Sequence, residues 1–205
     1  MERDIFIISA YCLVVEIMQI VEKTHKIRTK GFPPKLTDAE VITIEICGEF
    51  FKLHEDTEIY NYFKRHYLHF FPNLPSRTTF VRQSANLWQV KVICQSLIVQ
   101  MADQHRDPIQ SIDTLPLPVC TYTRGGFRDK RFPTQAEFGY CAAKKMDYYG
   151  FKLGLRISRI GMITHFPLLS ARTHDVNHLG SLIEGFSGTV PADKGFVDQS
   201  QQNLW

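Results

Sequence analysis

Two short stretches of the chain, Ile109-Gln110-Ser111-Ile112-Asp113 and Thr189-Val190-Pro191-Ala192-Asp193, decide the fold that the sequence predicts. Each stretch is short and rich in apolar residues, is predicted to be a strand, and ends in an aspartate. Neighbouring parallel strands of an open α/β sheet bring their carboxyl ends to one edge of the sheet. The sequence therefore predicts that Asp113 and Asp193, 80 positions apart, converge at the tips of adjacent strands.

The residues around these two stretches predict an α/β domain over residues 107–205. Alternating apolar and polar positions indicate strands, and a leucine-rich face indicates a helix. The predicted elements are an irregular basic excursion at 122–147, paired strands at 151–158 and 162–170 around a turn at 159–161, and a helix at 175–186.

The first half of the chain is predicted to be an all-helical N-terminal region over residues 1–106. Thr37 and Glu40 form a predicted capping box, and Ser76 is the predicted cap of the last helix. The predicted helices cover residues 4–23, 37–51, 55–70 and 76–104. The character of the sequence changes at Asp107-Pro108, where we place the boundary.

Composition narrows the class of protein. Hydrophobic residues make up 44% of the 205 positions, which is too many for a disordered chain, and five scattered cysteines argue against a disulfide framework or a Cys-rich zinc site. A net charge of +3 permits nucleic-acid binding without demanding it. Ser9, Glu16 and Gln19 interrupt the apolar stretch 5–21, so we predict a buried helix and no membrane segment.

The two aspartates suggest divalent-metal chemistry. Hard Mg²⁺ prefers oxygen ligands and needs few of them from protein, and two such ions stabilise the attacking and leaving oxygens of phosphodiester displacement. The alternative is that Asp113 and Asp193 are ordinary turn residues, because aspartate is common in turns.

Four segments in order resemble those of DDE-type bacterial insertion-sequence transposases: residues 111–116 (SIDTLP), 149–153 (YGFKL), 173–175 (THD) and 191–196 (PADKGF). The resemblance implies a ribonuclease H-like catalytic core, with Asp113 and Asp193 as catalytic ligands of Mg²⁺ or Mn²⁺ and Lys194 as a DNA contact. It implies DNA as the partner, both element ends and target, in the bacterial cytoplasm at the nucleoid, and leaves self-association open.

The sequence departs from the family pattern at two places. The family's third acidic residue, a Glu beyond the second aspartate, has no counterpart, since Glu184 precedes Asp193 and Asp198 follows it too closely. The predicted core is therefore incomplete at its C-terminus, and strand transfer is predicted to be impaired. Gly154 stands where many relatives carry His, which puts a secondary site contact in doubt.

Two further hypotheses for the function stay open. One is a catalytically inactive DNA-binding fragment that inhibits transposition, and the other is an unrelated metal-dependent nuclease with the same sheet.

Basic residues interleaved with aromatic ones predict a DNA-binding surface, with a solvated loop as the alternative. In the excursion they are Arg124, Arg128, Lys130, Arg131, Lys144, Lys145 and Lys152. Arg77 and Arg82 lie on the helix that follows Ser76, which predicts either a helix-turn-helix-like reader of element ends or a packing helix with a solvated basic face. His174 and His178 have a zinc-compatible spacing, but without an HExxH motif we favour surface roles.

Overall fold

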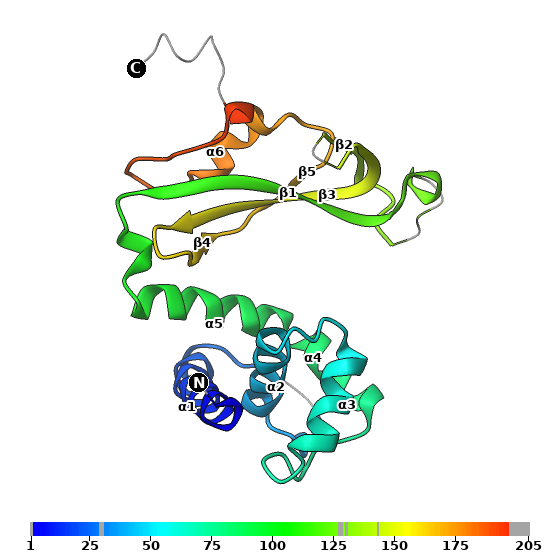
Figure 1. Ribbon diagram of the computed structural model, residues 1–205, viewed down its shortest axis with the longest axis vertical. Helices are drawn as coiled ribbons and strands as arrows, with labels where there is room; N and C mark the ends of the chain where they lie inside the picture. The colour runs from blue at the N-terminus through cyan, green and yellow to red at the C-terminus, as the bar shows by residue number, and fades with distance from the viewer. Residues whose placement is uncertain (1, 29–30, 127–128, 130, 143, 197–205) are drawn as a thin grey trace. The chain divides into compact units, whose positions relative to one another are not determined.

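The computed structural model describes residues 2–28, 31–126, 129, 131–142 and 144–196 of the chain. The chain forms two compact units, Met1–Ile98 and Val99–Trp205, which are described one at a time (Figure 1).

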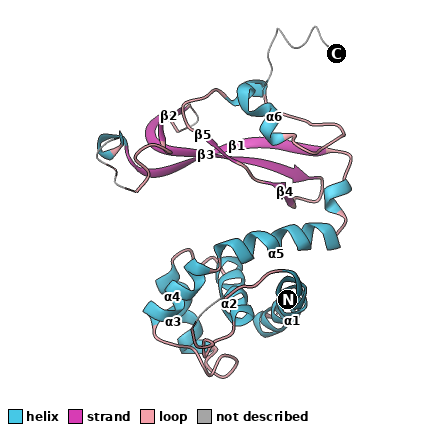
Figure 2. Cartoon of the chain, turned by 180° about the vertical axis from the view of Figure 1, so that it is seen from behind, coloured by secondary structure: helices cyan, strands magenta, loops and turns pink. Residues whose placement is uncertain are grey.

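The first unit is all-helical, as the sequence predicts, and Figure 2 colours all its regular elements as helices. The helices are α1 (Arg3–Thr24), α2 (Asp38–Phe50), α3 (Asp56–His66), α4 (Arg77–Asn86) and α5 (Trp88–Met101). The capping box is confirmed, since Thr37 Oγ1 accepts from the Glu40 amide and the Glu40 carboxylate accepts from the Thr37 amide. Ser76 caps α4 through the Thr79 amide.

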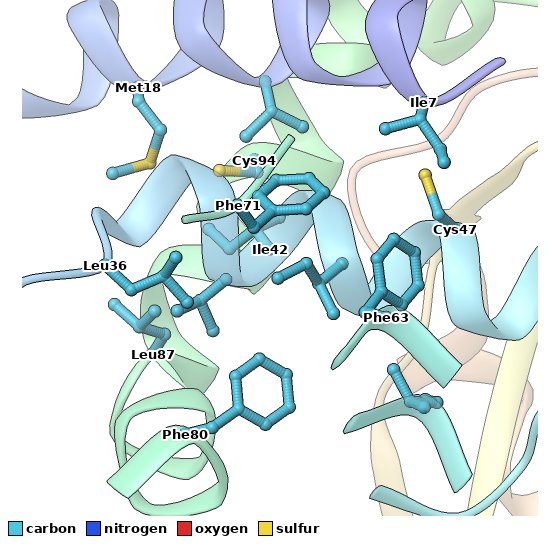
Figure 3. Packing of buried hydrophobic residues seen from close by; sticks show 14 of the residues in the cluster. Ile7, Met18, Leu36, Ile42, Cys47, Phe63, Phe71, Phe80, Leu87 and Cys94 are labelled. Carbon is cyan, nitrogen blue, oxygen red and sulfur yellow. The ribbon is translucent and has the colours of Figure 1, made fainter. Parts of the chain in front are cut away.

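The core of the first unit is built from one face of each helix. Ile7 and Met18 of α1 lie over Ile42 and Cys47 of α2, and Phe63 of α3 packs below them (Figure 3). These side chains are at most 4% exposed, so each contributes most of its transfer free energy, about 1.5–3 kcal/mol for a large apolar side chain.

Helix α1 buries only one face, so the prediction of a buried helix holds in part. Ile5 and Ile8 are each 52% exposed, whereas Ile7 and Ile17 are buried in the core. By length and composition alone α1 is long and apolar enough to cross a membrane, and 28% of its most apolar window is buried. A helix packed against α2 along one face is also what a core helix of a folded domain looks like.

Two predicted helix bounds were wrong. The helix predicted over 55–70 ends at His66, and the helix predicted over 76–104 is two helices that break at Leu87. At Leu87 the backbone leaves the helix (φ −90°, ψ 8°), and its amide donates to the Ser84 carbonyl, a tighter turn than an α-helix makes. This break places Leu87 in the core, 1% exposed, while the next residue, Trp88, is 62% exposed.

The second unit is a sheet centred on one long strand, β3 (Met146–Ser158). Strand β1 (Gln110–Thr121) pairs antiparallel with one edge of β3. The other edge of β3 pairs antiparallel with three short strands: β2 (Glu137–Cys141), β5 (Leu168–Ser170) and β4 (Ile163–His165). The predicted turn at 159–161 is confirmed, with Gly161 at φ 87°, a conformation that favours glycine.

A parallel segment completes the sheet beside β1. Isolated bridges pair Ile109 with Thr189 and Ile112 with Ala192, both parallel. The chain reaches this segment from β5 through a short helical crossover, η4 (Asp175–His178) and α6 (Leu179–Leu182), shorter than the predicted helix 175–186. The mixed sheet, the crossover and the helical first unit are compatible with the predicted α/β class.

Strand β1 is longer than predicted. Asp113 is its fourth residue and does not end it, because Thr114 to Thr121 continue the pairing with β3. Pro116 and Pro118 argue against a central strand, but the bridges to the parallel segment stop at Ile112, so both prolines lie where that edge of β1 carries no described partner. The predicted irregular excursion likewise contains β2 and the start of β3.

Asp107 holds the start of β1 to the β3–β4 turn. Its carboxylate accepts hydrogen bonds from the Arg159 amide (2.9 Å), the Arg159 Nε (2.9 Å) and the Ile109 amide (3.1 Å). The Arg159 amide is the main reason that the pKa of Asp107 is lowered, and it outweighs burial, which acts in the opposite direction. A carboxylate whose pKa falls on folding stabilises the fold above its unfolded pKa and loses that contribution as pH falls through the folded pKa.

We therefore predict that Asp107→Asn lowers the thermal unfolding midpoint at pH 7, and that the gap from wild type closes as the pH falls below about 4, near the unfolded pKa of aspartate. Circular dichroism melts at pH 7, 5 and 3 measure this. Asp147→Asn, at an exposed residue of β3 that forms no ion pair with the residues the structure describes, is the control and should show little effect. A gap of the same size at pH 3 and pH 7 would contradict the assignment.

Candidate functional site

Asp113 and Asp193 are neighbours across the parallel pairing. The Gln110 amide donates to the Thr189 carbonyl (3.1 Å), the Thr189 amide to the Pro108 carbonyl (2.8 Å), and the Ile112 amide to the Pro191 carbonyl (3.2 Å). These bonds keep one register from the first bridge to the last. Asp113 and Asp193 are the next residues in that register, so the structure brings together the two residues that the sequence singled out.

The register also sets the direction of the two side chains. Side chains alternate between the faces of a strand, and residues opposite one another in a parallel pair lie on the same face. Ile112 is buried under α6 in a cluster with Leu169, Leu182 and Phe196, so Asp113 lies on the opposite face of the sheet. Asp193 directly follows the last bridge, and continuing the register by one residue would put it on the same face as Asp113.

Both carboxylates are exposed and similarly bonded. Asp113 Oδ1 accepts from the Thr114 amide (2.7 Å), and Asp193 Oδ1 accepts from the Lys194 amide (2.6 Å). Among the described residues, no hydrogen bond or ion pair uses the other oxygen of either carboxylate. Each side chain therefore has one oxygen fixed against the backbone and one that is free to bind a ligand.

Within the described part of the chain, no group of three or more His, Cys, Asp or Glu side chains is arranged to hold a metal ion. The pair therefore has no third protein ligand among these residues. Glu184 is exposed at the end of the crossover, where its carbonyl accepts from Arg156. Asp198 lies outside the described residues. The structure thus presents two carboxylates with open positions around them.

The opposite face of the sheet carries an ion pair that the sequence did not predict. Lys152 Nζ donates to Asp175 Oδ1 and to the Thr173 carbonyl, each at 2.8 Å. The Lys152 side chain is 13% exposed, so its ammonium is committed to this contact and is a weak candidate for a free phosphate contact. The pair joins the segments 149–153 and 173–175, and the Asp175 carboxylate lies 4.0 Å from a Cβ built on Gly195, two residues past Asp193.

Arg156 is a second buried cation that the sequence did not single out. It is 8% exposed, and its guanidinium donates to the Leu182 and Glu184 carbonyls, both at 3.1 Å, at the end of α6. Burial lowers the pKa of Arg156. The signal that could have found both residues is alternation, since Lys152, Gly154 and Arg156 share the face of β3 that α6 covers.

The basic residues of the predicted excursion are placed in part. Arg124, Lys144 and Lys145 are exposed, and none of them forms an ion pair within the described part of the chain. Arg131 is held by Asp129 and donates to the Val119 carbonyl (3.0 Å). Burial acts to raise the pKa of Asp129, but hydrogen bonds from Arg131 outweigh it, and the pKa is lowered. Arg128 and Lys130 lie outside the described residues.

The other predicted DNA contacts lie at separate places. Lys194 is exposed directly after Asp193. In the first unit, Arg77 donates to Thr57 Oγ1 (2.8 Å) at the start of α4, and Arg82 is exposed one turn further along that helix.

Comparison with known proteins identifies the family. Residues 103–204 match the family model described as a transposase DDE domain, a range that contains β1, the crossover and both aspartates. The chain therefore belongs to the DDE-type transposases. No curated protein and no solved structure matches the chain.

The departure at Gly154 has a packing reason. A Cβ at this position would lie 2.6 Å from Leu182 Cδ2 and 2.8 Å from Leu169 Cδ1, in a cluster where both leucines are at most 6% exposed. Contacts this short force the neighbours to move. Position 154 therefore belongs to the packed face under α6, not to the face that carries the aspartates.

We predict that Gly154→Ala destabilises the fold by about 1–3 kcal/mol, the usual range for an overpacked core site. Gly180→Ala in α6, where a Cβ meets nothing within 4 Å, is the matched control and should be neutral or slightly stabilising. Chemical denaturation of the two variants and wild type measures the difference. Equal stability of the two variants would show that Gly154 is not tightly packed.

Proposed function

We propose that the chain is the DNA transposase of a bacterial insertion sequence, acting through a metal site at Asp113 and Asp193. The observation that carries the proposal is the parallel register that makes these two exposed carboxylates neighbours on one face of the sheet. The family match supports transposition as the activity and DNA as the partner.

The order of strands supports a ribonuclease H-like core. An antiparallel pair, β1 and β3, is followed by the short strands on the far edge of β3 and then by a crossover to a segment parallel to β1. This arrangement puts Asp113 on an inner strand of the sheet, with a neighbour on each side, and Asp193 at the end of the segment beside it.

The two aspartates fit Mg²⁺ or Mn²⁺. Each offers a free carboxylate oxygen, and Mg²⁺ keeps several waters and uses one or two carboxylates from protein. When bound, the metal would supply an activated water and charge stabilisation for phosphodiester hydrolysis and strand transfer. The Thr114 and Lys194 amides hold the other oxygen of each carboxylate and so orient the pair toward a shared ion.

Exposed basic residues of the second unit would hold the DNA. Lys194 follows Asp193 directly, whereas Arg124, Lys144 and Lys145 lie at the other end of β1 and β3 and form no ion pair with another described residue. Lysine and arginine bind the phosphate backbone whatever its sequence, which suits both element ends and target DNA. Because its substrate is DNA, we place the protein in the bacterial cytoplasm at the nucleoid. Self-association of the protein on DNA stays a prediction.

A second candidate function is DNA binding without catalysis, as an inhibitor that occupies element ends. The observation in its favour is that the described residues offer two metal ligands and no third. Loss of one member of a catalytic unit commonly removes most of the activity. Strand transfer by this chain is therefore proposed to be impaired, while metal binding by the pair and DNA binding persist.

We predict that Asp113→Asn and Asp193→Asn each weaken Mn²⁺ binding by at least about tenfold. Mutating a residue that only hydrogen-bonds to a metal ligand already lowers metal affinity about 10–100-fold. Isothermal titration of Mn²⁺ into the full chain measures this, with Asp147→Asn as the control at an exposed aspartate far along β3. Equal affinity in wild type and both site variants would remove the metal site and with it the proposed chemistry.

We also predict a strong dependence of DNA affinity on salt. Each phosphate contact contributes about one unit to the slope of log affinity against log salt, so the combined Arg124→Gln, Lys144→Gln and Lys145→Gln variant should reduce the slope by about 3. Fluorescence anisotropy on duplex DNA measures the slopes. Arg106→Gln, which removes an exposed arginine outside this segment, should leave the slope unchanged. An unaltered slope in the triple variant would exclude these side chains from the DNA surface.

A further inference from the structure

The first unit contains a cavity of about 360 Å³ beside α4 that the proposed chemistry does not use. Thr79, Arg82, Gln83 and Asn86 line it, and their spacing of three, four and seven residues puts them on one face of the helix. A wholly polar helix face turned toward a cavity contributes little to a hydrophobic core.

The cavity also has apolar lining residues. They are Ile27, Pro34 and Leu87, the C-cap residue of α4, and Leu87 is buried in the core of the unit. Phe32 also lines the cavity and is 97% exposed, the highest exposure of the large apolar side chains described. The cavity lining therefore combines apolar side chains, a polar helix face and an exposed aromatic ring.

Two arginines line the cavity, and one of them gives it an uncompensated positive charge. Arg28 is paired with Asp38, whose side chain is 7% exposed and also accepts from Gln83 Nε2 (2.8 Å). This hydrogen bonding fixes the Arg28 guanidinium and raises its pKa, with burial opposing the shift. Arg82 is exposed, and its guanidinium forms no ion pair or hydrogen bond with another described residue. One of the two positive charges thus remains without a carboxylate partner among the described residues.

We propose that this cavity binds one unpaired nucleotide of a DNA strand, with the base against Phe32 and the apolar lining residues and the phosphate on Arg82. Proteins that bind single strands combine cationic side chains with aromatic rings on which bases stack. The cavity lies within the usual size range of pockets for small ligands. The proposal rests on the proposed function only in taking DNA as the partner.

The shape of the site favours an unpaired nucleotide over duplex DNA. A duplex is read by an element that projects into its groove, whereas Thr79, Arg82, Gln83 and Asn86 line a hollow. Inorganic phosphate would use Arg82 but would gain nothing from Phe32. A base with its phosphate uses both, Arg82 through charge and the aromatic ring through stacking.

The test is fluorescence anisotropy of the full chain with a labelled ten-nucleotide single strand and with a labelled duplex. Phe32→Ala should weaken single-strand binding about tenfold, the order of the loss when one stacked base loses its aromatic partner, and should change duplex binding little. Phe32→Trp should restore the affinity. Arg82→Gln should weaken single-strand binding and reduce its salt dependence by about one unit.

Phe50→Ala and Arg65→Gln, at an exposed aromatic and an exposed arginine of the same unit outside the cavity, are the matched controls and should bind as wild type does. Unchanged single-strand affinity in Phe32→Ala, or an equal loss on single strand and duplex, would overturn the proposal. Neither result would touch the Mn²⁺ titration at Asp113 and Asp193, so failure of the cavity and failure of the catalytic proposal are distinguishable.

Discussion

Three backbone hydrogen bonds join the segment that ends at Asp193 to the start of β1, and the candidate site depends on them. They fix a constant register between residues 109–112 and 189–192. Because side chains alternate along a strand, a slip of one residue would turn Asp193 to the face that α6 covers, away from Asp113. Burial of Ile112 disfavours such a slip, because the register that exposes Asp113 also packs Ile112 against Leu182 and Phe196.

The two faces of the second unit's sheet have different tasks. On one face, α6 closes over Gly154, Leu169 and Ile112, and Arg156 binds the carbonyls at the end of that helix. The Lys152–Asp175 pair belongs to this face and fastens β3 to the crossover, which leads on to the segment ending at Asp193. The carboxylates lie on the other face. Packing on the covered face fixes the register of the strands and so sets the positions of the carboxylates.

The sequence predicted the helical first half, the turn at Gly161 and the neighbouring position of Asp113 and Asp193, because caps, glycine and apolar runs are local signals. The sequence did not predict the second half of β1, because Pro116 and Pro118 oppose a strand locally. Both prolines are compatible with a strand here because the bridges described on that edge of β1 stop at Ile112. The sequence also did not predict the helix break at Leu87. The local pattern would continue the helix, whereas in the structure the break accompanies burial of the Leu87 side chain. Lys152 was assigned to DNA because its charge was visible and its partner, Asp175, was 23 residues away.

The two aspartates are held with unequal rigidity, and this bears on how a metal would bind. Asp113 lies inside β1, which pairs with β3 on both sides of it. Asp193 lies after the last bridge, at the start of a single helical turn, and is held by its own contact with the Lys194 amide and by Phe196, whose ring is 7% exposed in the cluster with Ile112. A site on regular elements is more precise than one on a loop. Phe196 anchors the turn from which the second carboxylate projects, so under the proposed function it would influence metal affinity through the backbone.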